Sequence, residues 1–184
     1  MGANTRPALF IDRDGTLIRD EHYLKDPARV VLQPAAVELL RTFRDAGFAL
    51  VVITNQSGIA RGLLTEQDYE QVRMRLDQLL GASGVKLDLS LHCPHHPDHG
   101  GPCECRKPGT LLFERARDLL GLDLKRSTFV GDRWRDVAPA VVFGAHGVLV
   151  AGPDTPADEL ARAATAVRVV KGLADVARLV PSAG

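Results

Sequence analysis

Short apolar segments that are typical of buried strands alternate along this chain with segments of helical periodicity. The strand-like segments are residues 8–11, 49–54, 128–130 and 147–150, with 87–91 as a further candidate. Helical patterns occupy residues 34–46, 65–80, 110–120 and 137–143, and the tail at 155–180 offers a helix, a short strand and a last helix. Such alternation is typical of a parallel sheet covered by helices on both faces. We therefore predict an α/β fold with a single domain over residues 1–184.

Local signals set several boundaries of these elements. Thr65 suits a helix N-cap, and Asp68 stands where a capping box places an acidic side chain. Pro139 is compatible with a helix at 137–143 only in the first turn, because proline has no N–H to donate. Residues 93–108 are rich in proline, glycine, histidine and cysteine, so we predict that they form an irregular loop.

The charge of the chain is balanced. Its 184 residues include 23 basic and 23 acidic side chains and 5% aromatic residues, so nothing in bulk attracts nucleic acid or an anionic membrane. No apolar run is long enough to span a bilayer, and the first residues lack the pattern of a secretory signal. We expect a cytoplasmic protein without nucleic-acid or membrane partners. We also expect a monomer, since no coiled-coil pattern is present.

Polar side chains follow three of the predicted strands at the point where each strand ends. Asp12 and Asp14 follow the first strand, Thr54 ends the second, and Asp132 follows a later strand, with Asp136 close behind. Because the carboxyl ends of parallel strands meet at one edge of the sheet, these side chains should lie together. Clustered carboxylates repel one another unless a cation lies between them, and Mg²⁺ prefers oxygen ligands.

This arrangement suits phosphoryl transfer. Asp12 can attack phosphorus, and Asp14 can donate a proton to the leaving oxygen and then activate water. Thr54 and Lys107 can bind the nonbridging oxygens, and Asp132 completes the metal site. A single aspartate at a strand end is most often a cap or turn residue, but a set of strand-end motifs in one chain favours the catalytic interpretation.

All three cysteines fall within one short segment. Cys93, His95, Cys103 and Cys105 together supply the ligands of a closed tetrahedral zinc site, which would be structural. Such a site would order the loop and fix Arg106 and Lys107, which follow directly. A disulfide with one spare thiol, or three reduced thiols, is the alternative. Spacing alone does not separate His95 from the other histidines of the segment, His92, His96 and His99.

These motifs resemble those of a known superfamily. DRDGT, the threonine of TNQSG, the lysine of CRKP and the segment VGDRWRD are similar, in this order, to the four motifs of the haloacid-dehalogenase-like (HAD-like) phosphohydrolases. The resemblance implies a Rossmann-like core, Asp12 as nucleophile and Asp14 as acid and base. It also implies Thr54 and Lys107 on the phosphoryl group, and a magnesium site that includes Asp12, Asp132 and the backbone carbonyl of Asp14.

The cysteine loop narrows the resemblance. CPHHP, CECRKP and TNQSGIARG are similar to segments of the D-glycero-D-manno-heptose 1,7-bisphosphate phosphatases, which implies His95 as the zinc ligand and removal of a 7-phosphate from a sugar phosphate. It also implies a substrate pocket lined by Asp20, Tyr23, Asn55, Gln56, Ser57, Arg106 and Arg133. Arg106 and Arg133 could hold a second phosphate. The gap at 16–34 is too short for a folded cap, and the gap at 58–93 is filled by one helix and one strand of the core, so we expect an open, capless site.

Other functions remain compatible with the same residues. The substrate could be histidinol phosphate, another small ester or a nucleic-acid 3′-phosphate, and an acceptor other than water could take the phosphoryl group. A zinc-stabilised binding module without catalysis is the alternative from another class. Magnesium-dependent turnover distinguishes it from the enzymes.

Overall fold

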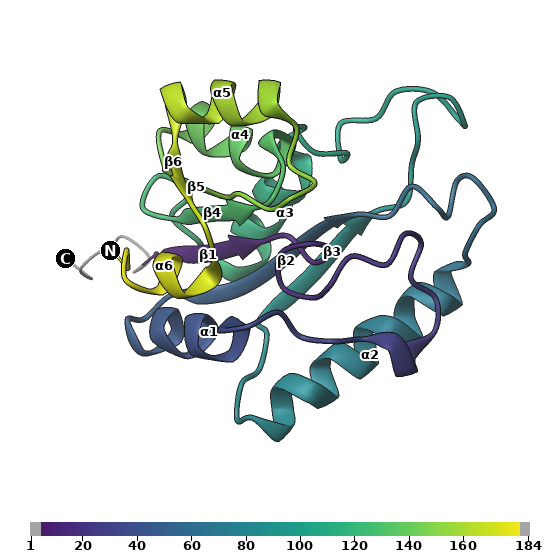
Figure 1. The fold of residues 1–184 in the computed structure, drawn as a ribbon, viewed down its shortest axis with the longest axis horizontal. Helices are drawn as coiled ribbons and strands as arrows, with labels where there is room; N and C mark the ends of the chain where they lie inside the picture. The colour runs from purple at the N-terminus through teal and green to yellow at the C-terminus, as the bar shows by residue number, and fades with distance from the viewer. Residues whose placement is uncertain (1–4, 181–184) are drawn as a thin grey trace.

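A six-stranded sheet with all strand pairs parallel forms the centre of the computed structural model, which describes residues 5–180 (Figure 1). The strand order is β3-β2-β1-β4-β5-β6, with β1 and β4 in the middle. The strands are β1 (Ala8–Ile11), β2 (Ala49–Asn55), β3 (Leu89–Cys93), β4 (Thr128–Gly131), β5 (His146–Val150) and β6 (Arg168–Val170). The predicted α/β fold is confirmed.

Helices cover both faces of the sheet (Figure 1). They are α1 (Ala36–Asp45), α2 (Glu66–Ala82), α3 (Leu111–Leu120), α4 (Trp134–Phe143), α5 (Ala157–Ala166) and α6 (Leu173–Ala177), with a 3₁₀ turn at Pro27–Arg29. The apolar side chains of α1, α2 and α6 pack in one cluster, and those of α3 and α4 pack in another. The sheet therefore lies between two apolar layers.

The central strands have apolar side chains on both faces. In β1, Leu9 and Ile11 join the cluster under α1 and α2, whereas Ala8 and Phe10 join the cluster under α3. This alternation follows from the period of two residues in a strand. A strand that is buried on both faces needs a continuous apolar sequence, which is why ALFI predicts it well.

Two boundaries differ from the prediction. The third strand runs from Leu89 to Cys93 rather than over residues 87–91, so Cys93 belongs to a strand and not to the irregular loop. Helix α4 begins at Trp134, three residues before the predicted start, so Pro139 lies beyond the first turn. The Asp136 carboxylate accepts a hydrogen bond from the backbone N–H of Arg133 and caps the earlier start. Pro139 is buried within the helix and donates no helical hydrogen bond.

Other local predictions are confirmed. Thr65 caps α2, and Asp68 completes the capping box with a bond from the Thr65 backbone N–H. The segment between β1 and α1 holds a single 3₁₀ turn and no inserted domain, so the core carries no cap there. Within residues 5–180, no helix combines the length and the apolar character that crossing a membrane requires.

Candidate active site

Three carboxylates meet beyond the carboxyl ends of β1 and β4. Asp12 follows β1 directly, and its backbone N–H donates to the carbonyl of Val130 in β4 over 3.0 Å. Oxygens of Asp12, Asp132 and Asp136 lie within 4.8 Å of one another. Asp12 and Asp136 are buried, and Asp132 is half-buried. The expected meeting of Asp12 with Asp132 is confirmed, and Asp136 lies with them.

Lys107 brings a positive charge to this group from a distant part of the chain. Its Nζ lies 2.6 Å from Asp12 Oδ1 and 2.8 Å from Asp136 Oδ1, and it donates to the carbonyl of Ile53 over 2.6 Å. The Asn55 side chain holds the Lys107 backbone at both its N–H, 3.0 Å away, and its carbonyl, 3.2 Å away. Lys107 is therefore fixed both at its amine and at its main chain.

Burial shapes the charges of the group. It raises the pKa of Asp12 to about 8, although Lys107 opposes this and the neighbouring carboxylates add to it. Burial, followed by the charge of Asp136, raises the pKa of Asp132 to about 6. Burial alone would lower the pKa of Lys107, but Asp12 and Asp136 outweigh it and the pKa rises. One ammonium group faces several carboxylates, so the electrostatics of the site would favour a further positive charge.

This excess of carboxylate oxygen fits a magnesium ion. A divalent cation beside Asp12 and Asp132 would stabilise their ionised forms, which burial disfavours. Gly15 lies directly against Asp132, and a Cβ built on it would be 2.7 Å from Asp132 Oδ2. Gly15 also has φ +81, so glycine is required by both space and conformation. The turn after β1 is thus shaped around Asp132, whose Oδ1 also accepts from Thr16 over 3.2 Å.

Asp14 lies at the side of this group. Its Oδ2 accepts from Gln56 Nε2 over 2.7 Å and from Thr54 Oγ1 over 3.4 Å, and both of these side chains are buried. Gln56 Nε2 also lies 2.8 Å from Thr54 Oγ1. The structure therefore brings Thr54 and Gln56 to Asp14, and Lys107 to Asp12.

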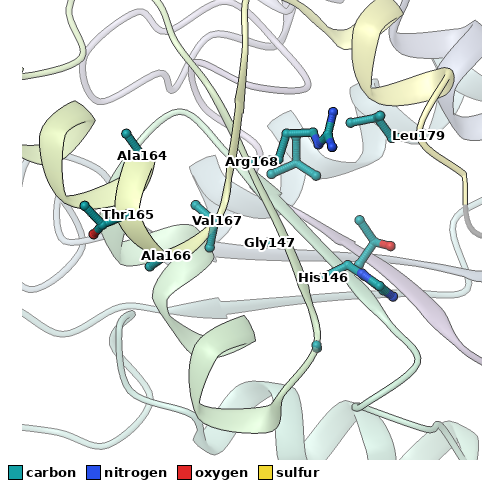
Figure 2. A pocket seen from close by; sticks show the side chains of 11 residues that line it. His146, Gly147, Ala164, Thr165, Ala166, Val167, Arg168 and Leu179 are labelled. Atoms are coloured by element: carbon teal, nitrogen blue, oxygen red, sulfur yellow. The ribbon is translucent and has the colours of Figure 1, made fainter.

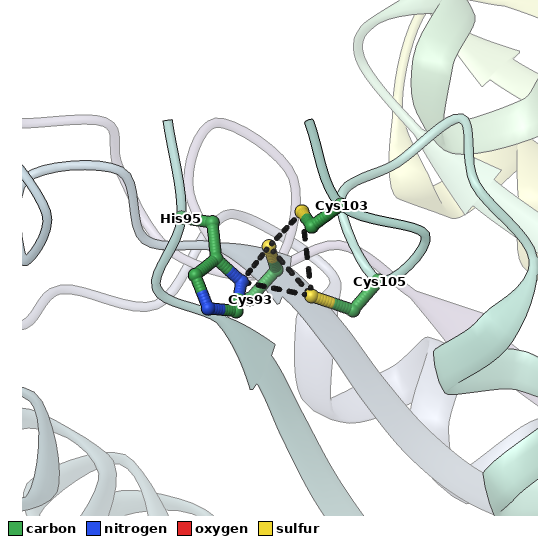
Figure 3. Close-up of side chains that lie close together, drawn as sticks. All are labelled: Cys93, His95, Cys103 and Cys105. Carbon is green, nitrogen blue, oxygen red and sulfur yellow. Dashed lines mark hydrogen bonds between the residues drawn. The ribbon is translucent and has the colours of Figure 1, made fainter. Parts of the chain in front are cut away.

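The cysteine loop forms a second, separate cluster (Figure 3). Sγ of Cys93 lies 3.6 Å from Sγ of Cys103 and 3.1 Å from Sγ of Cys105, and Nδ1 of His95 lies 3.1 Å from Sγ of Cys105. These separations are too long for a disulfide, and the three cysteines are free. Tetrahedral zinc with Zn–S bonds of about 2.3 Å would space its sulfurs by about 3.8 Å. The four donors fit such an ion with a small expansion.

The cluster connects the end of β3 to the segment that carries Lys107. Cys93 is the last residue of β3, and Cys105 comes two residues before Lys107. Arg106 Nη1 donates to the carbonyl of His95 over 3.2 Å, which joins the two sides of the loop. Among the other histidines, His92 contacts Glu66 instead, at 2.9 Å.

The outer residues predicted to bind substrate have varied surroundings. The Tyr23 hydroxyl accepts a hydrogen bond from Arg61, whose guanidinium also lies over the Tyr23 ring. Asp20 accepts from the backbone N–H of His22 and shapes the turn. Arg133 makes a two-pronged ion pair with Glu159 of α5, at 2.8 and 3.2 Å. Arg133 is thus already paired, whereas Arg106 bonds only a backbone carbonyl among the contacts described. Ser57 is half-buried beside Gln56.

Sequence analysis gave no role to two residues that the structure brings into this site. Asp136, which the sequence placed at this edge without a function, pairs with Lys107, and this pairing joins segments that are distant in the chain. Arg13 pairs with Asp14 from beneath the site, and nothing in the pattern of the DRDGT turn indicates the direction of its side chain.

A cavity of considerable volume lies elsewhere in the protein. It has a volume of about 520 Å³ and includes Thr128, His146 and Arg168, the first residues of β4, β5 and β6 (Figure 2). These are the amino ends of the strands, at the opposite edge from Asp12. Cavity volume therefore does not point to the carboxylate group, whose expected ligand, a phosphate ester, needs charge and hydrogen-bond donors rather than a deep apolar cavity.

Known proteins are similar to this chain over nearly its whole length. A family described as HAD-hydrolase-like matches residues 104–176, and one described as polynucleotide kinase 3 phosphatase matches residues 8–138. The D-glycero-β-D-manno-heptose-1,7-bisphosphate 7-phosphatase of Escherichia coli O6:H1 is 38% identical and covers 95% of this chain and 94% of its own. The enzyme of that name from Vibrio cholerae is 34% identical, with 93% and 94% covered. The crystal structure of D,D-heptose 1,7-bisphosphate phosphatase from B. bronchiseptica with magnesium and phosphate has a TM-score of 0.81 and 30% identity, with 94% of this chain and 97% of that chain covered.

Proposed function

This chain belongs to the HAD-like phosphatases, and from that premise we propose that it removes the 7-phosphate of D-glycero-D-manno-heptose 1,7-bisphosphate. The observation that supports this most is the pairing of buried Asp12 with Lys107 beside the Cys/His cluster. The relatives that are similar over nearly the whole chain carry the name of this activity.

The first half of the proposed reaction transfers the phosphoryl group to Asp12. A carboxylate oxygen of Asp12 attacks phosphorus, the bond from phosphorus to the sugar oxygen breaks, and Asp14 donates its proton to that oxygen. Lys107 would bind the nonbridging oxygens of the phosphoryl group, because its Nζ lies 2.6 Å from Asp12 and is held by Asp136 and by the carbonyl of Ile53. Thr54 would donate a hydrogen bond to the same oxygens.

The second half returns the enzyme to its starting state. Water attacks the phosphorus of the Asp12 acyl phosphate, and the Asp14 carboxylate takes the proton of the water. The bond between phosphorus and the Asp12 oxygen breaks, which releases inorganic phosphate and restores the carboxylate. Asp14 thus ends protonated, ready for the next substrate.

Magnesium would supply the further positive charge that this reaction needs at the transferring group. We propose that Asp12, Asp132 and the backbone carbonyl of Asp14 hold it. Asp136 instead orients Lys107, since it already pairs with that amine and caps α4. We propose that Cys93, His95, Cys103 and Cys105 hold a structural zinc ion, which would order the loop before Lys107.

The sugar would lie over the loops that surround the strand ends. We propose that the sugar contacts side chains of these loops, namely Asp20, Tyr23, Asn55, Gln56 and Ser57. Arg106 would bind the distal phosphate. Arg133 could join it only by leaving Glu159 or by sharing that carboxylate's charge. We also propose that the enzyme acts as a monomer in the cytoplasm, where a reducing environment keeps zinc thiolates intact.

The match to the polynucleotide 3-phosphatase family supports a second candidate substrate, a nucleic-acid 3′-phosphate. The chemical steps would be the same. The balanced charge of the chain, with 23 basic and 23 acidic residues, offers little to a polyanion. We therefore place this substrate second.

Phosphate release from a panel of esters tests the proposal. The panel contains both anomers of the heptose bisphosphate, histidinol phosphate, fructose 1,6-bisphosphate and a 3′-phosphorylated oligonucleotide, each with Mg²⁺ and with a chelator. We expect the highest kcat/KM for a heptose bisphosphate and loss of turnover with the chelator. A higher kcat/KM for another ester would reject the heptose bisphosphate as the substrate but keep the mechanism. No phosphate release from any ester would reject the proposed phosphatase activity.

A further inference from the structure

Arg13 lies between the two aspartates of the DRDGT turn, yet its side chain is directed into the protein. Its guanidinium is 2% exposed. Nε lies 3.1 Å from Asp14 Oδ1 and 3.2 Å from Oδ2, and Nη2 lies 3.0 Å from Oδ2. Both oxygens of Asp14 are therefore held by one arginine.

The ring of Tyr69 packs against the guanidinium of this arginine. The guanidinium carbon lies 5.4 Å from the centre of the Tyr69 ring, and Tyr69 is 1% exposed in helix α2. Tyr69 also contacts His92, whose ring centre lies 3.9 Å away and whose Nε2 contacts Glu66. A row of contacts thus runs from Asp14 through Arg13 and Tyr69 to strand β3, one residue before Cys93.

A buried guanidinium is expensive to maintain, because burial removes it from water and each donor then needs a partner. Here Nη1 has no hydrogen-bond partner among the described residues. An apolar side chain would fill the space beneath the turn without this penalty. Packing alone therefore does not explain the arginine, whereas its hold on both Asp14 oxygens does.

We propose that Arg13 is a positioning residue that sets the direction of the Asp14 carboxylate for proton transfer to the leaving oxygen. Gln56 holds the same carboxylate from the other side, at 2.7 Å, so the two donors together restrict its rotation. The role of Arg13 rests on the proposed function, in which Asp14 is the acid and base. Arg13 touches neither substrate nor phosphorus in this role and acts through Asp14.

The chemistry of the leaving group gives a readout for this role. A sugar alkoxide is strongly basic and needs a proton as it departs, whereas p-nitrophenolate departs readily without one. Loss of a correctly directed acid therefore slows an alkyl ester more than an aryl ester. General damage to the fold or to Asp12 slows both esters alike.

The experiment compares kcat/KM for p-nitrophenyl phosphate and for the most active alkyl ester of the panel, in the wild type and in Arg13→Met. This ratio reports the step in which the leaving group departs and not the later hydrolysis of the acyl phosphate, which both esters share. We expect the Arg13→Met loss to be at least about tenfold larger on the alkyl ester, within the range that general acid catalysis contributes. Arg13→Lys keeps a donor and should recover part of the loss. Arg41→Met, an exposed arginine of α1 whose guanidinium bonds Ser83, is the matched control and should change neither rate.

Asp14→Asn tests the acid role of Asp14 separately from the positioning role of Arg13. If it shows leaving-group selectivity and Arg13→Met slows both esters equally or not at all, only the role of Arg13 is overturned. If Asp14→Asn itself shows no selectivity, the acid role of Asp14 and the role of Arg13 both fail. Should Arg13→Met not fold, Tyr69→Leu instead removes the ring that packs against Arg13, with Tyr69→Phe as its ring-preserving control. The same selectivity is then expected for Tyr69→Leu, and equal losses on both esters overturn the proposal.

Discussion

At the scale of single residues, Asp12 is a carboxyl group whose ionised form is disfavoured by its surroundings. Burial raises its pKa to about 8, and Lys107 only partly compensates. The same burial excludes water from the carboxylate, which would make its ionised oxygen a better nucleophile in the proposed reaction. Reactivity and reduced stability at this position therefore have one cause.

Substitution of Asp12 by asparagine should separate these two effects. We expect Asp12→Asn to lower kcat by at least about 10⁴-fold, because the amide cannot form the acyl phosphate. The neutral amide escapes the burial penalty, so the thermal midpoint without Mg²⁺ should not fall at pH 8. Steady-state kinetics and calorimetry on one preparation measure both, and turnover close to that of the wild type would exclude Asp12 as nucleophile.

The raised pKa values also predict how Mg²⁺ binding depends on pH. The folded-state pKa is about 8 for Asp12 and about 6 for Asp132, both above the ordinary value. The folded protein thus holds protons that the unfolded chain has released, so metal-free stability should fall as pH rises from about 4 to 8. Mg²⁺ must displace those protons, and its affinity should increase over pH 6 to 8, by up to about tenfold per unit for each proton released.

Thermal midpoints with and without Mg²⁺ at pH 6 and pH 8 measure this linkage. We expect the larger increase in midpoint at pH 8, and a smaller pH dependence in Asp12→Asn, which has one proton fewer to displace. An increase that is equal at the two pH values would contradict the assignment of these carboxylates to the metal.

At the scale of elements, the loop between β3 and α3 has no regular structure, and its ends are joined at the Cys/His cluster. Cys93 ends a strand, whereas Cys103 and Cys105 lie in the loop just before Arg106 and Lys107. The loop packs few apolar side chains, so metal ligation is the strongest restraint that its residues offer. Order in the loop and the position of Lys107 are thereby coupled.

Removal of one ligand tests this coupling. We expect Cys103→Ser to lower zinc below one ion per chain and to reduce kcat by about 10-fold or more, since a misplaced lysine weakens transition-state binding. His99→Ala, in the same loop but outside the cluster, is the matched control and should retain both zinc and activity. Elemental analysis with kinetics measures this, and one full zinc per chain in Cys103→Ser would contradict the ligand assignment.

At the scale of the whole molecule, the sheet and α3 meet at a group of aromatic rings. The ring centre of Phe10 lies 5.2 Å from that of Phe113 in α3 and 4.8 Å from that of Phe129 in β4. Phe10 precedes Asp12, the proposed nucleophile, by two residues, so the same short strand carries core packing on one face and leads into the proposed site at its end. The stability of the core thus supports the geometry of the site.

Truncation of this ring should destabilise the whole protein. We expect Phe10→Ala to lower the free energy of unfolding by about 3–5 kcal/mol, because it removes buried contacts and leaves a cavity. Val142→Ala, at a position that is 70% exposed, should change it by less than about 0.5 kcal/mol. Denaturant titration measures both, and a loss below about 1 kcal/mol for Phe10→Ala would show that the site collapses around the smaller side chain.

The sequence by itself determined which elements form and which edge of the sheet carries the chemistry. The continuous apolar run of β1 and the capping box at Thr65 are local signals, and period and capping act over a few neighbouring residues. The motifs at Asp12, Thr54 and Asp132 could be placed together because parallel strands end at a common edge. The resemblance to HAD-like phosphatases extended this to the chemical class.

Only the tertiary structure decided which side chains contact one another at that edge. The partnership of Asp136 with Lys107, the pairing of Arg133 with Glu159 and the inward direction of Arg13 join segments or select rotamers that no local pattern encodes. The earlier start of helix α4, in contrast, follows from a local signal, since Asp136 caps the helix from three residues after Arg133. Direction and partnership of a side chain depend on packing from all sides, and packing is a property of the folded molecule.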